Sequence, residues 1–88
     1  MAIKHSSRKK GGVQTLRYME DGGEIEVGVF DQGEYTFTLD RDQTVKILRG
    51  GMVVNNVHHI RGEELSFTAG TTVVIVCRFP CAYICFYE

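Results

Sequence analysis

The fold is decided by residues 27–37, which read VGVFDQGEYTF. Residues 27–30 have the β-branched, aromatic and small side chains that are typical of a strand. Residues 31–33, Asp-Gln-Gly, are typical of a turn. Polar and apolar side chains then alternate at a period of two, which indicates a second strand. The stretch therefore predicts a β-hairpin.

The second strand of this hairpin has one polar and one apolar face. Its polar face carries Glu34, Thr36 and Thr38. Its apolar face carries Tyr35, Phe37 and Leu39. If the polar face points into a concavity, Glu34 is its most chemically capable residue. The aromatic face would then be exposed, and an exposed aromatic patch on a small domain predicts a dimer interface.

The rest of the chain consists of short strand-like runs separated by turn residues. Strands are expected over residues 13–19, 25–30, 34–39, 44–48, 52–54, 58–60, 65–67, 71–78 and 81–87. The run 71–78 is almost continuously apolar, which predicts burial on both faces, and Pro80 separates it from the last strand. No stretch has a sustained helical period. The pattern predicts an all-β, small single-domain barrel or sandwich.

Length and charge restrict the classes of function. The chain has 88 residues and a net charge of -1, so nothing attracts it as a whole to nucleic acid or to an anionic membrane. Residues 1–12 are basic and end in two glycines, which predicts a flexible N-terminus before a single domain over residues 13–88. A domain of this size buries only about 60 to 65% of its unfolded surface, so a homodimer is expected. With no long apolar segment, we expect a soluble, cytoplasmic protein.

The cysteines and histidines give weak signals for a metal site. Cys77, Cys81 and Cys85 are odd in number and lack close-pair spacing, so we expect free thiols that fill the core, with redox or metal chemistry as the alternative. His58 and His59 are adjacent, so on a strand they point to opposite faces and cannot easily share an ion.

The glycine spacing resembles the two sequence motifs of the cupin superfamily. Counted from Gly62, the positions of the second motif's proline, glycine, histidine and asparagine are filled by Thr68, Gly70, Val73 and Cys77. Laid from Gly28, the first motif has its two histidines at Glu34 and Thr36 and its glutamate at Gln43. The resemblance implies a cupin-type, jelly-roll-like β-barrel. Only one of these positions carries a strong metal ligand, which predicts a metal-independent site.

A closer resemblance is to the small cupins known as pyrimidine/purine nucleoside phosphorylases. It covers the chain from about Gly12 and includes the VGV run, the block GEYTF at 33–37, and glycines 50 and 62. The C-terminal segment matches at Pro80, Tyr83, Cys85 and Tyr87. The chain departs from this family in a shorter hairpin after Gly50, in Thr68-Ala69-Gly70 where a proline-glycine turn is usual, and in Phe86 where an arginine is usual. The resemblance implies phosphate-dependent cleavage of purine and pyrimidine nucleosides to free base and ribose 1-phosphate, with no cofactor except inorganic phosphate as co-substrate.

The candidate site combines the polar face, the last strand, the glutamate position of the resembling cupin motif and one of the available cations. We predict Glu34 as the catalytic residue. The predicted substrate-binding residues are Thr36, Thr38, Gln43, Arg49, Tyr83 and Tyr87. Hydroxyl groups can donate and accept hydrogen bonds to a sugar, and tyrosine can stack on a base. The phosphate cation is expected among Lys46, Arg49, Arg61 and Arg78.

Three alternatives stay open. Glu34 could be a rim residue paired with Lys46 or Arg49, and the two tyrosines could be ordinary barrel packing. The protein could be a non-catalytic cupin that binds a small molecule or serves as a structural module. It could also be a metal-dependent cupin enzyme that combines Glu34 with a histidine from elsewhere.

Overall fold

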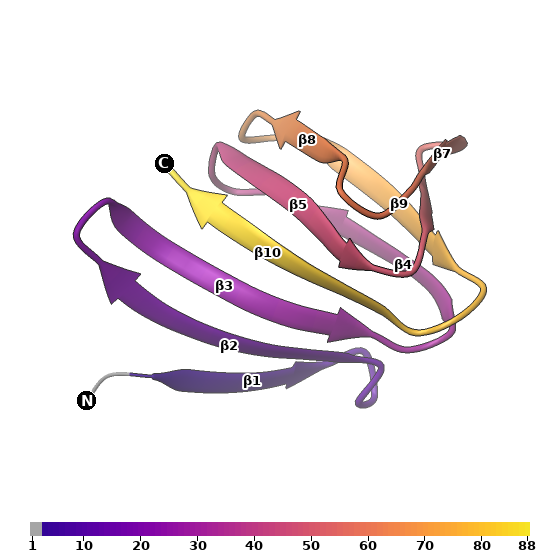
Figure 1. Cartoon of the computed structure of the whole chain (residues 1–88), viewed down its shortest axis with the longest axis horizontal. Helices are drawn as coiled ribbons and strands as arrows, with labels where there is room; N and C mark the ends of the chain where they lie inside the picture. Colours follow the sequence, from indigo (N-terminus) through magenta and orange to yellow (C-terminus); the bar gives the residue numbers. More distant parts are fainter. Residues whose placement is uncertain (1–2) are drawn as a thin grey trace.

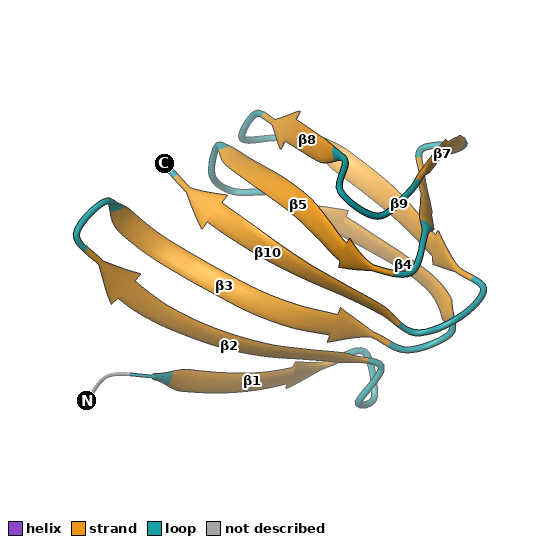
Figure 2. Ribbon diagram, in the orientation of Figure 1, coloured by secondary structure: helices purple, strands orange, loops and turns teal. Residues whose placement is uncertain are grey.

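The computed structural model describes residues 3–88, which form two antiparallel β-sheets packed against each other (Figure 1). The strands are β1 (Lys4–Arg8), β2 (Val13–Glu20), β3 (Gly23–Phe30), β4 (Gly33–Thr38), β5 (Gln43–Arg49), β6 (Met52–Val54), β7 (Val57–His59), β8 (Glu64–Phe67), β9 (Thr72–Cys77) and β10 (Cys81–Tyr87). One sheet has the order β1-β2-β3-β10-β5-β8 and the other the order β4-β9-β6-β7. In the described part of the chain, only strands, turns and loops occur (Figure 2).

The strand prediction is confirmed. Each of the nine expected runs is a strand whose ends differ from the predicted ends by at most two residues. Asn55 and Asn56 form the β6–β7 turn with positive φ values of 49° and 68°, a conformation that asparagine tolerates well. Over residues 3–88, no helix is long and apolar enough to cross a membrane.

The N-terminal segment differs from the expectation. Residues 1–12 were predicted as a flexible terminus, but Lys4–Arg8 forms β1, which pairs along its whole length with the edge of β2. Gln14 on β2 holds this strand through hydrogen bonds with His5 (2.9 Å) and Ser7 (2.8 Å). All five β1 side chains are exposed, so the hydrophobic pattern carried no signal for this strand. The division into residues 1–12 and 13–88 stays a prediction, and residues 1 and 2 lie outside the described range.

The two faces of β4 are reversed relative to the expectation. Tyr35 is buried, and Phe37 and Leu39 pack against the core, whereas Glu34 and Thr36 are exposed. The Tyr35 hydroxyl donates a hydrogen bond to the backbone carbonyl of Asp31 (2.9 Å), so the phenol has a polar partner at the core boundary. The predicted inward polar face is therefore wrong, and so is the exposed aromatic patch that supported a dimer interface there.

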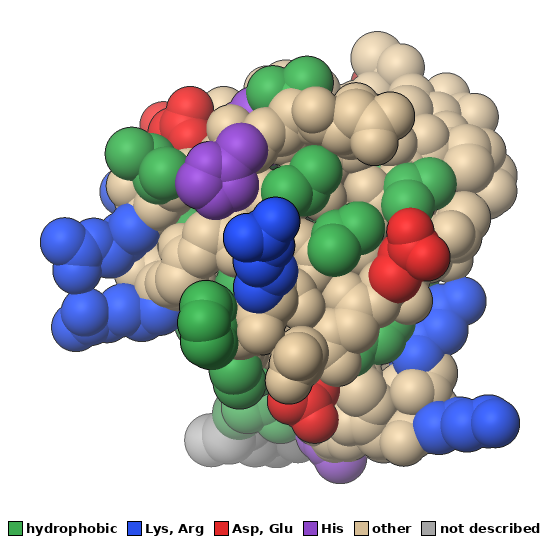
Figure 3. All heavy atoms as spheres, turned by 90° about the vertical axis from the view of Figure 1, so that its right-hand side faces the viewer, with side chains coloured by type: hydrophobic (Ala, Val, Ile, Leu, Met, Phe, Trp, Pro, Cys, Tyr) green, Lys and Arg blue, Asp and Glu red, His purple; other side chains and the backbone are tan. Residues whose placement is uncertain are grey.

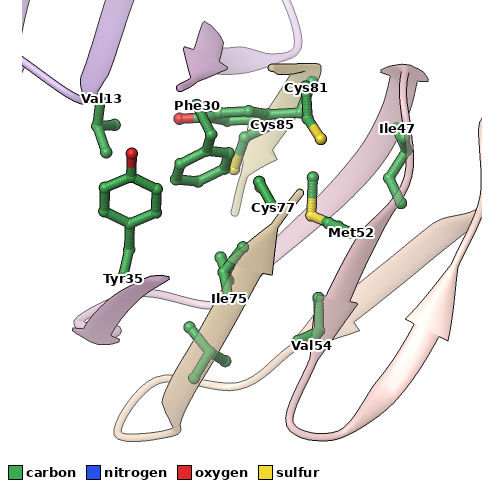
Figure 4. Close-up of a cluster of buried hydrophobic side chains, with 12 residues drawn as sticks. Val13, Phe30, Tyr35, Ile47, Met52, Val54, Ile75, Cys77, Cys81 and Cys85 are labelled. Atoms are coloured by element: carbon green, nitrogen blue, oxygen red, sulfur yellow. The ribbon is translucent and has the colours of Figure 1, made fainter. Parts of the chain in front are cut away.

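The core lies between the sheets and includes all three cysteines (Figure 4). Cys77, Cys81 and Cys85 are each 1% exposed and unpaired, which confirms the prediction of buried free thiols. Burial raises the pKa of Cys77 and of Cys85 to about 12, so both are neutral thiols at physiological pH.

The prediction that residues 71–78 are buried on both faces is wrong. On β9, Val73, Ile75 and Cys77 are buried, whereas Val74 and Val76 are only half-buried. The physical reason is the two-layer architecture, in which the inner face of the smaller sheet is covered and the outer face is not.

Candidate functional site

A cavity of about 350 Å³ lies between the two sheets. Most of its wall is aromatic or aliphatic, as is usual for small-molecule pockets. The charged side chains of its lining are Arg8, Arg17, Arg41, Glu26 and Asp40. The cavity therefore combines an apolar wall with a few charges, three of them guanidinium groups.

Strand register explains how polar groups gather around Glu26. Glu26 lies on β3 between Arg17 of β2 and Cys85 of β10, and its side chain points inward. Tyr83 and Tyr87 lie two residues before and after Cys85, so they are the diagonal neighbours of Glu26 on the same face of the sheet. Three adjacent strands thus direct a carboxylate, a guanidinium and two phenols at one point.

The carboxylate of Glu26 accepts hydrogen bonds from all three polar neighbours. Arg17 Nη2 donates to Oε1 at 2.6 Å, the Tyr87 hydroxyl donates to Oε1 at 3.1 Å, and the Tyr83 hydroxyl donates to Oε2 at 2.7 Å. Glu26 is only 3% exposed, so these bonds compensate for the loss of hydration of the carboxylate.

These contacts fix the protonation states in the cavity. Burial raises the pKa of Glu26, but the hydrogen bonds from Arg17 and Tyr83 outweigh it, and the net pKa lies below its ordinary value. Burial, followed by the charge of Glu26, raises the pKa of Tyr83 and of Tyr87 well above their usual range. At neutral pH the site therefore holds a charged carboxylate facing two protonated phenols.

Gly28 makes room for this arrangement. It is the direct cross-strand partner of Tyr83, and a Cβ atom at Gly28 would lie 2.6 Å from the Tyr83 ring and hydroxyl oxygen. Any side chain here would displace the phenol that donates to Glu26. A glycine within a strand often marks such a close approach.

Tyr87 lies between two arginines. The guanidinium carbons of Arg17 and Arg41 are 4.9 Å and 4.5 Å from the centroid of the Tyr87 ring, within the range of a cation–π contact. Arg41 also forms an ion pair with Glu24. Both guanidinium groups are thus held in place by a carboxylate and the same ring.

Gln43 is fixed by its neighbours. Its Oε1 accepts a hydrogen bond from the Cys85 thiol (3.1 Å), and its Nε2 donates to the Arg41 carbonyl (3.2 Å). The neutral Cys85 thiol is what makes the first of these bonds possible, because a thiolate could not donate. Gln43 thereby connects the Arg41 backbone to the centre of the barrel.

Four of the seven predicted site residues line the cavity, and three do not. Thr38, Gln43, Tyr83 and Tyr87 are among its lining residues, although Thr38 is exposed and belongs to the outward face of β4. Glu34, Thr36 and Arg49 are exposed and are absent from its lining. The prediction that Glu34 faces the concavity is therefore wrong, because the aromatic face of β4 packs inward.

The sequence reasoning missed the carboxylate that does face the cavity, Glu26. The inward face of β3 carries Glu26, Gly28 and Phe30, whereas the more apolar face with Val27 and Val29 points outward. The usable signals were a mid-strand glycine on the same face as the carboxylate and a basic residue, Arg17, in the preceding strand.

The three arginines that line the cavity were also missed in the sequence. None of the four cations proposed from the sequence, Lys46, Arg49, Arg61 and Arg78, lines the cavity. Phe86, at the position where an arginine is usual in the resembling family, is exposed on the outer face of β10 and is not part of this wall.

Potential metal ligands do not gather in the described part of the chain. Among residues 3–88, no three side chains of histidine, cysteine, aspartate or glutamate are placed to hold one ion. His58 is exposed, and His59 Nδ1 lies 3.7 Å from a carboxylate oxygen of Glu63. Independence from metal stays a prediction.

The lowered pKa of Glu26 predicts how stability depends on pH. A carboxyl group whose pKa is lower in the folded state stabilises the fold above its unfolded pKa, and this contribution is lost as the pH falls through the folded value. The unperturbed pKa is 4.5. In urea titrations from pH 7 to pH 3, we expect the free energy of unfolding of the wild type to fall below about pH 4.5. Glu26→Gln should lack that part of the slope, and parallel curves would contradict the ion pair.

Comparison with curated proteins supports the resemblance seen in the sequence. A protein named pyrimidine/purine nucleoside phosphorylase from Vibrio parahaemolyticus is 29% identical over 93 aligned residues, which cover 99% of both chains. A protein of the same name from Vibrio campbellii is 27% identical, again over 99% of both chains. No family model matches the chain.

Comparison with solved structures supports the fold. A protein of unknown function from Vibrio parahaemolyticus superposes with a TM-score of 0.92 at 26% identity and covers 97% of both chains. An RmlC-like cupin from Shewanella frigidimarina superposes with a TM-score of 0.72 at 16% identity, over 97% of this chain and 82% of its own. The chain thus has the cupin-type β-barrel fold, and over its full length it is similar in sequence to proteins named pyrimidine/purine nucleoside phosphorylase.

Proposed function

We propose that the protein is a nucleoside phosphorylase and that the cavity around Glu26 is its active site. The observation that carries this proposal is the buried, charged carboxylate of Glu26, which faces an apolar cavity together with two phenols and nearby arginines. The cavity volume of about 350 Å³ is within the range of small-molecule pockets. The names of the similar proteins support the same reaction.

In the proposed reaction, positive charge develops on the ribose in the transition state, and the Glu26 carboxylate stabilises it. An oxygen of inorganic phosphate forms a bond to C1′ of the ribose, the bond from C1′ to the base nitrogen breaks, and its electron pair leaves with the base. The transition state has oxocarbenium character, so a fixed negative charge nearby lowers the barrier. Glu26 is charged at neutral pH because its hydrogen bonds outweigh the effect of burial on its pKa, which suits this electrostatic role and does not suit that of a general acid.

The phenols act as fixed hydrogen-bond donors. Because their pKa values are raised, Tyr83 and Tyr87 keep their protons and cannot supply one readily to the leaving base. They hold the Glu26 carboxylate, and their rings offer apolar surface next to the sugar or the base. The proton for the departing base then comes from water.

A phosphate-dependent assay tests this function. Purified protein is incubated with adenosine or uridine, with and without inorganic phosphate, and free base and ribose 1-phosphate are quantified. We expect both products only when phosphate is present, at a rate unchanged by prior dialysis against a chelator. Folded protein that releases no base from several nucleosides would overturn the proposal. Release of base without phosphate would indicate hydrolysis instead.

One observation favours the alternative, a non-catalytic binding module. The hydrogen bonds from Arg17, Tyr83 and Tyr87 satisfy Glu26 without any ligand, as in a structural network of a stable barrel. In that case, nucleosides would bind without turnover or would not bind, and the same assay separates the two functions.

We also propose a homodimer, through a surface other than the one predicted from the sequence. The outer face of the six-stranded sheet carries the apolar side chains of Leu16, Val27, Val29, Ile84 and Phe86. Leu16, Val27 and Ile84 are cross-strand neighbours, and Leu16 and Val29 are 47% and 46% exposed. On the side of the molecule seen in Figure 3, by contrast, hydrophobic side chains are interspersed with charged ones. A surface patch that lies on a two-fold axis contacts its own copy, so we propose a second copy of the chain as the partner of this apolar face.

Substitution on this face tests the dimer. We expect the wild type to have the mass of a dimer by light scattering and Val29→Glu to shift it to a monomer, because two buried carboxylates would face each other across the axis. Val57→Glu, a similarly exposed position on β7, is the control and should leave the mass unchanged. A monomeric wild type at micromolar concentration would contradict the proposal.

A further inference from the structure

The arginines that line the cavity differ in whether they form an ion pair with a carboxylate. Arg17 forms an ion pair with Glu26 at 2.6 Å, and Arg41 forms one with Glu24. Arg8 also lines the cavity, and within residues 3–88 it has no carboxylate within 4.0 Å. Of the three arginines in the lining, Arg8 is the one that forms no ion pair with a described residue.

A second cation, Lys9, contacts the same ring as Arg8. The guanidinium carbon of Arg8 lies 5.3 Å from the centroid of the Phe37 ring, and Lys9 Nζ lies 5.2 Å from the same centroid. Phe37 is itself part of the cavity wall. Arg8 thus places a positive charge at the wall of the cavity, and Lys9 contacts the same ring from a position outside the lining. Neither forms an ion pair with a carboxylate of residues 3–88.

The β1–β2 turn fixes the backbone that carries these two residues. Lys9, Lys10 and Gly11 all have positive φ values, 54°, 58° and 87°. The backbone NH groups of Gly11 and Gly12 donate to the carbonyls of Arg8 and Lys9, both at 3.1 Å, and Gln14 Nε2 donates to the Gly11 carbonyl at 2.9 Å. A left-handed backbone is uncommon for lysine, so the turn has a defined shape rather than that of a free terminus.

We propose that Arg8 is the phosphate-binding residue of the cavity and that Lys9, which is outside the lining, adds a second positive charge through the same turn. This inference rests on the proposed phosphorolysis. A guanidinium group binds two phosphate oxygens at once, and a neighbouring ammonium group adds a second positive charge. The cation–π contacts to Phe37 are easily exchanged for contacts to an anion. The same subsite would hold the phosphoryl group of ribose 1-phosphate, because product and co-substrate share this chemistry. Arg17 and Arg41 remain with their carboxylates and shape the sugar side of the cavity.

Kinetics with a charge-matched control test this subsite. Arg8→Gln is expected to raise the KM for phosphate by about tenfold to a hundredfold, because this is the range for losing a hydrogen bond to a charged group. The KM for nucleoside should change by less than about twofold. Arg8→Lys should recover part of the loss. Lys10→Gln removes the same charge at a side chain that neither lines the cavity nor makes a cation–π contact with Phe37, and it should leave both constants unchanged. An unchanged KM for phosphate in Arg8→Gln would overturn the inference while leaving phosphorolysis intact.

A binding measurement separates the subsite from the reaction. Phosphorus NMR titration of the wild type with inorganic phosphate should show saturable binding that Arg8→Gln weakens and Lys10→Gln does not. If this difference is found but no nucleoside is cleaved, the proposed function fails and the subsite stands. If phosphate binding is the same in wild type and Arg8→Gln, the subsite is wrong, whatever the activity.

Discussion

Glu26→Gln is expected to lower kcat for phosphorolysis by about a hundredfold, because removing one electrostatic stabiliser of a transition state typically costs a factor of 10² to 10³. Glutamine has nearly the shape of glutamate and keeps one acceptor oxygen, which can bond to Tyr83 while the amide nitrogen faces Arg17. The charge that stabilises the oxocarbenium is what is lost. Steady-state rates with uridine at saturating phosphate measure the effect.

Two further variants make this result specific. Glu64→Gln removes a carboxylate that is exposed on β8 and should leave kcat unchanged. Glu34→Gln changes the carboxylate that the sequence predicted as catalytic. Glu34 is exposed and outside the cavity lining, so this variant should keep the activity of the wild type. A large loss of activity in Glu34→Gln with little change in Glu26→Gln would refute the assignment of the site.

Gly28→Ala is expected to affect stability and activity together. The new methyl group would lie 2.6 Å from the Tyr83 ring, so either the ring or the strand must move. Overpacking of this kind costs about 1–3 kcal/mol of the free energy of unfolding. The displaced phenol donates to Glu26, so we also expect kcat to fall. This loss should exceed the loss of activity that follows from a smaller fraction of folded protein. Urea unfolding and the phosphorolysis assay measure the two effects.

Gly22→Ala is the matched control, because a Cβ atom there has no other atom within 4 Å. We expect it to change the free energy of unfolding by less than about 0.5 kcal/mol. A double-mutant cycle with Tyr83→Ala locates the clash: the cost of Gly28→Ala should largely disappear once the ring is removed. A cost that persists would mean that Gly28 is required for a reason other than Tyr83.

The strands could be predicted because their signals are local. Turn residues such as Asn55, Asn56 and Pro80 mark the ends of strands, and alternation shows which side chains share a face. Strand β1 was missed because it is exposed throughout and carries no hydrophobic pattern. Backbone pairing with β2 holds it, and such pairing leaves no trace in the side chains.

The centre of the site could not be predicted because alternation does not say which face of a strand is inside. On β4 the apolar face points inward, as is usual, but on β3 the apolar residues Val27 and Val29 point outward and Glu26 points inward. The inward carboxylate is acceptable only because Arg17, Tyr83 and Tyr87 satisfy it, and these partners come from β2 and β10. Tyr83 and Tyr87 were found because their strand matched the resembling family.

The most direct test of the central claim, that the cavity around Glu26 is the active site, is a crystal structure of the protein with ribose 1-phosphate bound. Our account predicts the sugar inside the cavity with a ribose hydroxyl within hydrogen-bond distance of the Glu26 carboxylate. It also predicts the phosphoryl group beside Arg8. A sugar bound on the outer face of β4 next to Glu34, with the cavity empty, would contradict it.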